Sequence, residues 1–168
     1  MQRRSLLKLG AVSAALLAAA GGVLVRSRAG IDGSQLSAGG REVFRAVGRS
    51  ILDGSLPTEA GARALALTGL IDRVNGLVAA LPAHAQAELS QLLAVLDTAA
   101  GRLGLAGLSA DWPDADEAQI QQALQTMRVS GIALRQQAYH ALHDIVGGAY
   151  FSDASTWVQL GYPGPLKI

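Results

Sequence analysis

The fold of this chain is decided by the stretch LTGLIDRVNGLVAAL, residues 67–81, which runs directly into Pro82. Its large apolar side chains recur every three or four residues, the spacing of one face of an α-helix. Proline lacks the amide hydrogen that a continuing helix needs, so we expect the helix to stop there. We place its start near Thr58-Glu59. The apolar stripe comprises Leu67, Leu70, Ile71, Val74, Leu77 and Leu81.

The same spacing recurs on both sides of this stretch, and no segment alternates in the manner of a half-buried strand. Glycines 101, 104 and 107 weaken the end of the third helix. The four other stripes are Val43, Phe44, Val47, Ile51 and Leu52; Leu89, Leu92, Leu93, Leu96 and Leu103; Ile120, Ala123, Leu124 and Met127; and Ile132, Tyr139, Leu142, Ile145 and Val146. We therefore predict an all-α domain, an antiparallel bundle of about five helices.

Composition and charge exclude several classes of protein. The chain has 168 residues, 50% hydrophobic and 16% charged, which suits one folded domain. It has no cysteine, so disulfides, thiolate metal sites and CxxCH haem attachment are excluded. Five of the 14 basic residues lie in the first 28 positions, and the remaining 140 residues have a net charge of −4. An acidic body without a basic stripe argues against nucleic-acid binding.

The first ten residues, MQRRSLLKLG, resemble a twin-arginine export signal, whose consensus is Ser/Thr-Arg-Arg-x-Phe-Leu-Lys. Such signals direct proteins across the bacterial membrane in the folded state, often with a cofactor bound. The residues that carry the match are Arg3, Arg4, Leu6, Leu7 and Lys8.

The apolar run after this motif leaves two interpretations open. Residues 9–25 would form a helix of about 25 Å, slightly short of the roughly 30 Å hydrocarbon core of a bilayer. Ala18-Ala19-Ala20 offers a cleavage site of the Ala-x-Ala kind. The segment is therefore expected to be either a cleaved signal or an uncleaved membrane anchor.

Candidate ligand residues in the body are few. His140 and His143 lie three residues apart beside Asp144, but no third metal ligand has a supporting spacing. We expect a solvated histidine pair on the polar side of the stripe that Leu142 defines. A haem held through His140 or His143 is the alternative, which would make the chain an electron-transfer protein. A second alternative, an autonomous enzyme, is disfavoured because no catalytic constellation is visible.

An acidic cluster precedes the fourth helix. Asp111, Asp114, Asp116 and Glu117 resemble a calcium loop only superficially, because the glycine and the closing glutamate of an EF-hand are missing. We expect these residues to cap the helix instead.

The C-terminal sequence GGAYFSDASTWVQLGYPGPLKI, residues 147–168, departs from the helical pattern. It holds four of the seven aromatic residues of the chain, and it ends in two prolines that restrict their predecessors. We expect an extended tail. Its rings either fold back onto the protein's own core or fill pockets on another protein, where Trp and Tyr are enriched.

Two motifs in this region resemble the gluconate 2-dehydrogenase subunit 3 family, the small subunits of bacterial membrane-associated flavin dehydrogenases. They are Tyr150-Phe151-Ser152-Asp153 and the segment WVQLGYPGP at residues 157–165. The twin-arginine motif and the small cysteine-free helical body agree with the resemblance. It implies a chain that is neither catalytic nor cofactor-bound.

The resemblance also implies partners. The first is a large FAD-containing dehydrogenase of the glucose-methanol-choline type, which would cross the membrane bound to this chain through the twin-arginine machinery. A c-type cytochrome is a further expected partner, and the location is the periplasm, with or without anchoring to the membrane. The residues implied in partner binding are Tyr150, Phe151, Asp153, Trp157, Leu160, Gly161, Tyr162, Pro163, Gly164 and Pro165, with Trp157 and Tyr162 as anchors.

The chain is therefore expected to have four parts. Residues 1–28 form the signal or anchor, and residues 29–40 form a linker. Residues 41–150 form the helical domain, and residues 151–168 form an extended tail that binds the partner.

Overall fold

The computed structural model of the protein describes residues 29–164. The signal predicted at residues 1–28 and Pro165 of the predicted tail lie outside this range. The helices are α2 (Ala38–Ile51), α3 (Ala60–Ala80), α4 (Ala83–Asp97), α5 (Ala99–Gly101), the π-helical turn η2 (Arg102–Ala106), α6 (Glu117–Arg128), α7 (Ala133–Phe151) and the 3₁₀ helix η3 (Ala154–Leu160). The described chain is mainly helical, so the all-α prediction is confirmed.

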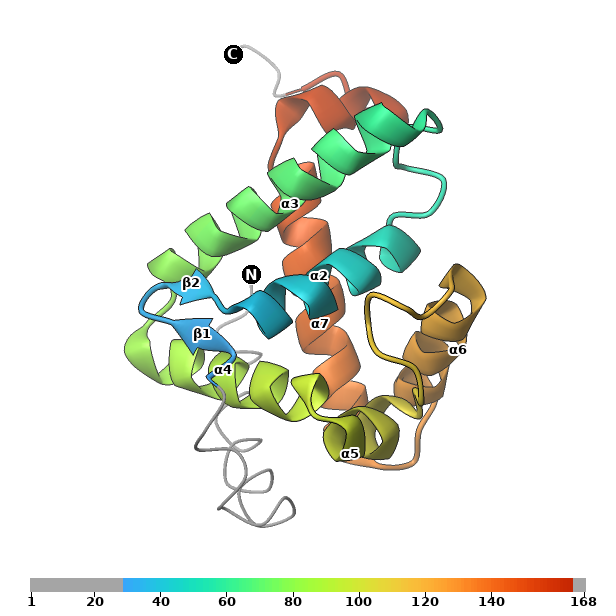
Figure 1. The fold of residues 1–168 in the computed structure, drawn as a ribbon. Helices are drawn as coiled ribbons and strands as arrows, with labels where there is room; N and C mark the ends of the chain where they lie inside the picture. Colours follow the sequence, from blue (N-terminus) through green and yellow to red (C-terminus); the bar gives the residue numbers. More distant parts are fainter. Residues whose placement is uncertain (1–28, 165–168) are drawn as a thin grey trace.

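Helix α2 lies at the centre of the fold. It contacts α3, α4, α6 and α7, and Figure 1 shows it crossing the middle of the molecule with α7 passing behind it. Val43, Phe44 and Val47 are completely buried there. Because α7 crosses α2 and α3 steeply, the helices surround a central helix and do not form the antiparallel bundle that we expected from the stripes.

The helix ends follow local sequence signals. The Glu59 carboxylate accepts hydrogen bonds from the amides of Gly61 and Ala62 at 2.8 and 2.6 Å, and these bonds lower the pKa of Glu59. Asp116 and Gln119 form a reciprocal capping box at the start of α6, with bonds of 2.8 and 3.0 Å. The capping role expected of the acidic cluster is therefore confirmed for Asp116.

Some residues of the predicted stripes lie outside the core. Leu77 is 40% exposed, and its neighbour Val78 is buried instead. Leu103 is 57% exposed because the third predicted helix ends at Asp97 and the chain continues through α5 and η2. Ile132 precedes α7 and is 54% exposed. The stripes identified the helices but not every inward side chain.

The segment predicted as a linker, residues 29–40, is folded. Strands β1 (Ile31–Asp32) and β2 (Gln35–Leu36) form an antiparallel hairpin, and α2 begins at Ala38. The hairpin contacts α3 and α4. Ile31 and Leu36 are buried, so this segment belongs to the domain and does not merely connect to it.

The segment predicted as an extended tail is also folded in its described part. Phe151 is the last residue of α7, and residues 154–160 form η3. The expectation of an extended chain is therefore wrong for residues 151–160. We expected an extended chain because proline disfavours a helix. The prolines begin only at Pro163, however, and Asp153 caps a helix before them.

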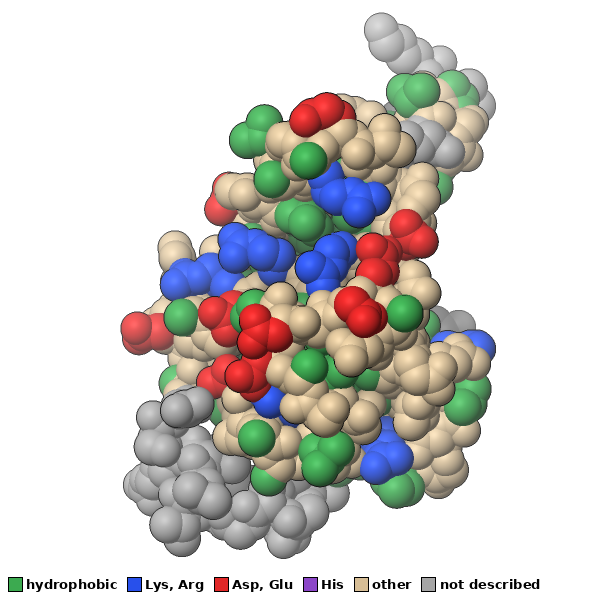
Figure 2. Space-filling view, turned by 45° about the vertical axis from the view of Figure 1, so that its right-hand side comes forward, with side chains coloured by type: hydrophobic (Ala, Val, Ile, Leu, Met, Phe, Trp, Pro, Cys, Tyr) green, Lys and Arg blue, Asp and Glu red, His purple; other side chains and the backbone are tan. Residues whose placement is uncertain are grey.

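Two further properties concern the charge on the surface and the apolar character of the helices. In Figure 2, basic and acidic side chains lie next to one another across the middle of the visible face, so that face carries no purely basic stripe. Within residues 29–164, no helix combines the length and the apolar character needed to cross a membrane.

Candidate functional site

The sequence motifs at the C-terminus fold into one compact unit, which we call the C-terminal knob and define as residues 149–164. It consists of the end of α7, the helix η3 and the turn that follows η3. Figure 1 shows it at one end of the molecule, in red, next to α3. The two sequence motifs, which are separated by three residues, therefore share one folded unit.

Trp157 is the centre of the knob. Its indole Nε1 donates a hydrogen bond of 2.8 Å to the backbone oxygen of Phe151. The Tyr162 ring lies with its centroid 5.3 Å from that of Trp157, tilted by 58°. Gly164 lies close to the same indole, since a Cβ at this position would be 3.8 Å from a ring carbon. Trp157 thus holds both ends of the knob together.

Gly161 explains one of the glycines in the motif. Its φ is 66°, a left-handed conformation in which glycine avoids the steric cost that other residues bear. The chain turns back at this point, so that the Tyr162 amide donates to the backbone oxygen of Trp157 at 3.1 Å. The turn brings the Tyr162 ring against Trp157.

Asp153 begins η3. One carboxylate oxygen accepts hydrogen bonds from the hydroxyl and the amide of Ser155 at 2.8 and 3.0 Å. These two bonds are the main reason why the pKa of Asp153 lies below its ordinary value of 3.8, and the nearby positive charge of Arg73 acts in the same direction. The other oxygen lies 3.3 Å from a terminal nitrogen of Arg73.

Arg73 is the functional candidate that sequence reasoning missed. It projects from α3, and its Nε donates to the backbone oxygen of Ala149 at 2.8 Å. Its guanidinium carbon is 6.0 Å from the centre of the Tyr150 ring. Arg73 and Asp153 are 80 residues apart in sequence, and no local pattern links them.

Tyr150 supports the knob from inside. It is 3% exposed, and its hydroxyl donates to the backbone oxygen of Ser55 at 2.8 Å. Its ring meets Phe151 edge-on with centroids 5.2 Å apart, and Phe151 is half-buried. Tyr150 therefore packs inside the protein, as in the alternative in which the rings fold back onto the core, and its part in partner binding stays a prediction.

The knob exposes several apolar side chains. Val158 is 82% exposed, Leu160 56% and Tyr162 48%, and Pro163 is exposed as well. Of these residues the sequence had not singled out Val158. Gly161 is exposed beside them, whereas Gly164 is half-buried. The predicted tail residues thus divide into an internal set around Trp157 and an outward set.

The predicted histidine pair lies elsewhere, on α7. Leu142 is completely buried while His140 and His143 are exposed, which confirms that both histidines flank the apolar stripe. The Nδ1 atom of His143 lies 3.2 Å from a carboxylate oxygen of Asp144. The Tyr139 ring lies 5.5 Å from that of His143.

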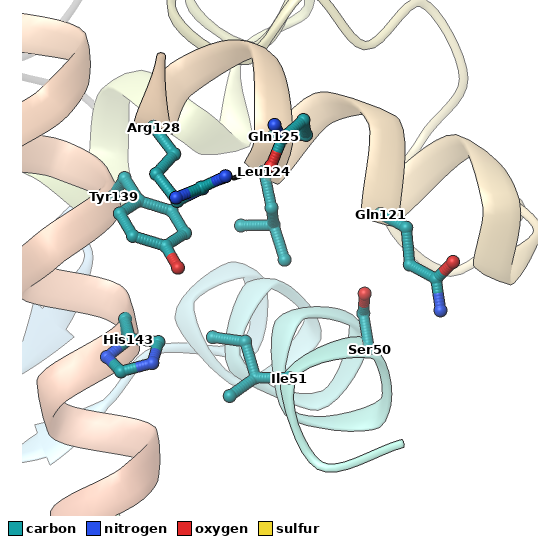
Figure 3. A pocket seen from close by; sticks show the side chains of 8 residues that line it. All are labelled: Ser50, Ile51, Gln121, Leu124, Gln125, Arg128, Tyr139 and His143. Carbon is teal, nitrogen blue, oxygen red and sulfur yellow. Dashed lines mark hydrogen bonds between the residues drawn. The ribbon is translucent and has the colours of Figure 1, made fainter. Parts of the chain in front are cut away.

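His143 borders a shallow hollow between α2, α6 and α7, which Figure 3 shows from close by. Its volume is about 220 Å³, below the roughly 300–1,000 Å³ of most small-molecule sites. It is lined by Ser50, Ile51, Gln121, Leu124, Gln125, Arg128, Tyr139 and His143. The dimensions give little support to a haem beside His143.

Among residues 29–164, no group of three or more histidine or carboxylate side chains is placed to hold a metal ion. Comparisons of the chain with protein-family models, with curated proteins and with solved structures found no match. The C-terminal motifs and the geometry of the knob are therefore the features from which we infer a function.

Proposed function

We propose that this chain is the non-catalytic small subunit of a periplasmic FAD-dependent sugar or alcohol dehydrogenase complex. It resembles the gluconate 2-dehydrogenase subunit 3 family in its C-terminal motifs, and it escorts the flavoprotein subunit across the membrane by the twin-arginine route. The observation that carries this proposal is that the second motif, as far as residue 164, folds into the C-terminal knob and leaves Val158, Leu160 and Tyr162 exposed there.

The knob has the properties of a docking element. Val158, Leu160 and Tyr162 are exposed large apolar side chains that are close together in sequence, on or just after η3. Clusters of this kind on a protein surface commonly mark interaction sites. Because Trp157 and Asp153 already hold the backbone in place, docking would order few further groups, and this lowers the entropic cost of binding. Trp157 then acts as the support of the anchors and not as an anchor itself.

The two ends of the described chain lie in different parts of the molecule. Residue 30 packs against α4, where Ser90 accepts a hydrogen bond from the neighbouring Ile31 amide at 3.1 Å. The knob lies near the other end of the molecule in Figure 1, next to α3. The knob and the hairpin at the start of the described chain are therefore separate parts of the surface.

In this proposal the chain contributes recognition and the export address, and the chemistry belongs to its partner. FAD is held by the large glucose-methanol-choline subunit, and a c-type cytochrome receives the electrons. The leader either is cleaved after export or remains as an anchor that keeps the complex at the membrane.

The docking role is tested by purifying the tagged full-length chain from the membranes of its host and assaying the copurified protein for FAD. We expect Val158→Ser/Leu160→Ser to lower the flavoprotein yield about tenfold, because the exposed apolar contacts are lost. The matched control is Val129→Ser/Ile132→Ser, which changes two exposed apolar residues beyond the opposite end of α7 and should leave the yield unchanged. An unchanged yield in the first variant, or a Soret band in place of flavin absorbance, would contradict the proposal.

The escort role has a separate test. Replacing Arg3 and Arg4 by lysine should leave the flavoprotein in the cytoplasm, because the twin-arginine machinery reads that pair. Dehydrogenase activity is measured in cytoplasmic and periplasmic fractions. A normal periplasmic activity would show that this chain does not supply the export address.

A further inference from the structure

Arg73 joins α3 to the end of α7 and to the first motif, at the start of the knob. Its Nε donates to the backbone oxygen of Ala149, and a terminal nitrogen lies 3.3 Å from Asp153. The Arg73 side chain is 27% exposed and that of Asp153 38%, so the pair is partly shielded from water. Water still screens such a pair, so the fixed geometry that it gives the knob matters more here than its energy.

Arg73 donates a hydrogen bond to a carbonyl group at the C-terminal end of α7. The last carbonyl groups of a helix have no partner within the helix, and a positive charge near them is favourable. Ala149 finds its partners in Arg73 and in the Ser152 hydroxyl, which donates at 2.8 Å. Phe151 finds its partner in the Trp157 indole. The α7 terminus and η3 are therefore stabilised by the same small set of side chains.

Arg73 is connected through Asp153 to η3, which carries exposed apolar residues. Arg73 holds Asp153, and Asp153 caps η3 through Ser155. Val158 is part of η3, and Leu160 is its last residue. The guanidinium of Arg73 is therefore linked, through Asp153, to the helix that carries these apolar side chains.

We infer that Arg73 is the positioning residue of the C-terminal knob, which it holds in the orientation that presents Val158 and Leu160 to the partner subunit. Arg73 itself contacts Ala149, Tyr150 and Asp153, none of which belongs to η3. The role in docking rests on the proposed function, whereas the effect on the knob's own structure does not.

The chain offers a direct readout of the knob in the absence of any partner. It has two tryptophans, and each indole donates a hydrogen bond of 2.8 Å, Trp112 to the backbone oxygen of Leu96 in the core and Trp157 to that of Phe151 in the knob. The two indole N–H resonances in a proton–nitrogen NMR spectrum therefore report on the core and the knob separately. A Trp157→Phe variant assigns them.

We expect Arg73→Gln to accelerate hydrogen exchange at the Trp157 indole about tenfold, because a charge-assisted hydrogen bond is lost, and to leave the Trp112 indole unchanged. Arg73→Lys should give an intermediate rate, since one ammonium group reproduces the charge but not the fork of donors. Arg45→Gln is the matched control, an exposed arginine of α2, and should alter neither indole. An unaltered Trp157 rate in Arg73→Gln would overturn the inference.

The docking arm uses the copurified flavoprotein subunit and measures its affinity for each full-length variant. Arg73→Gln should weaken binding about tenfold, and Arg45→Gln should not. If Arg73→Gln accelerates exchange but leaves affinity unchanged while Val158→Ser/Leu160→Ser lowers it, the positioning role is overturned and the proposed function stands. If Val158→Ser/Leu160→Ser also has no effect on affinity, the proposed function fails, and Trp157 exchange still reports whether Arg73 orders the knob.

Discussion

The hairpin at residues 29–36 and the C-terminal knob at residues 149–164 are the two peripheral segments of the described chain. Both lack the helical apolar spacing in their sequences, and both are folded. They differ in where their apolar side chains point. Leu36 of the hairpin is 1% exposed, whereas Leu160 of the knob is 56% exposed. Leu36 therefore belongs to the core, whereas Leu160 remains on the surface.

The difference follows from the bonds that hold each segment. The hairpin is fixed by the body, since Ile31 donates to Ser90 and Leu36 donates to Asn75, at 3.1 and 2.9 Å. The knob is fixed mainly by its own residues, apart from the contacts made by Arg73 and Tyr150. A segment that carries its own hydrogen bonds can keep its shape without burying every apolar residue. The knob therefore keeps its shape while some of its apolar side chains stay exposed, whereas the hairpin uses its apolar side chains to complete the core.

The largest expected effect concerns the two leucines. Leu36→Ala should lower the free energy of unfolding by about 2–5 kcal/mol, because it leaves a cavity in the core. Leu160→Ala, the same change on the knob, should stay within about 0.5 kcal/mol. Urea unfolding followed by circular dichroism measures both. Equal losses in the two variants would mean that Leu160 is buried in solution.

A smaller effect is expected for two glycines. A Cβ at Gly30 would lie 2.5 Å from the backbone oxygen of Ser90, so Gly30→Ala should destabilise the whole domain by about 1–3 kcal/mol. Gly161→Ala places alanine at a φ of 66°, at a cost of about 1–2 kcal/mol that should fall on the knob alone.

The measurement that separates these variants is hydrogen exchange at the two tryptophan indoles. Gly161→Ala should accelerate exchange at Trp157 only, whereas Gly30→Ala should lower the stability of the whole domain and affect both. Gly147→Ala is the control, because this glycine lies within α7 with no atom in the way of a Cβ and alanine favours a helix. Accelerated exchange at Trp112 in Gly161→Ala would show that the knob is not an independent unit.

The smallest expected effect is the response to acid. The pKa of Asp153 is lower in the folded chain than its ordinary value of 3.8, so its carboxylate stabilises the knob fully above that value. The contribution is lost as the pH falls through the lowered pKa. The Trp157 indole resonance should therefore shift below pH 3.8 in the wild type but not in Asp153→Asn. A titration of this resonance tests the sign, with Glu59→Gln as a control that keeps the knob intact.

Part of the candidate site could be predicted from its sequence. The sequence indicates that the motifs around Tyr150 and Trp157 belong to one region, and they do lie together in the knob. It also predicts the Asp116 cap from residues next to it. The division of the motif into inward and outward residues was not predictable. Tyr150 is buried because Ser55, 95 residues earlier, accepts its hydroxyl, and this contact depends on how α7 crosses the body.

The sequence by itself determined that the chain folds as a small helical domain without cysteine chemistry, and it determined the ends of α3 and the start of α6. These properties depend on residues three or four positions apart and on caps, which act within a single turn. Only the tertiary structure decided that Leu36 is buried, that Val158 is exposed and that Arg73 meets Asp153. Such contacts join residues far apart in the chain, and they exist only once packing has set the crossing of α3 and α7.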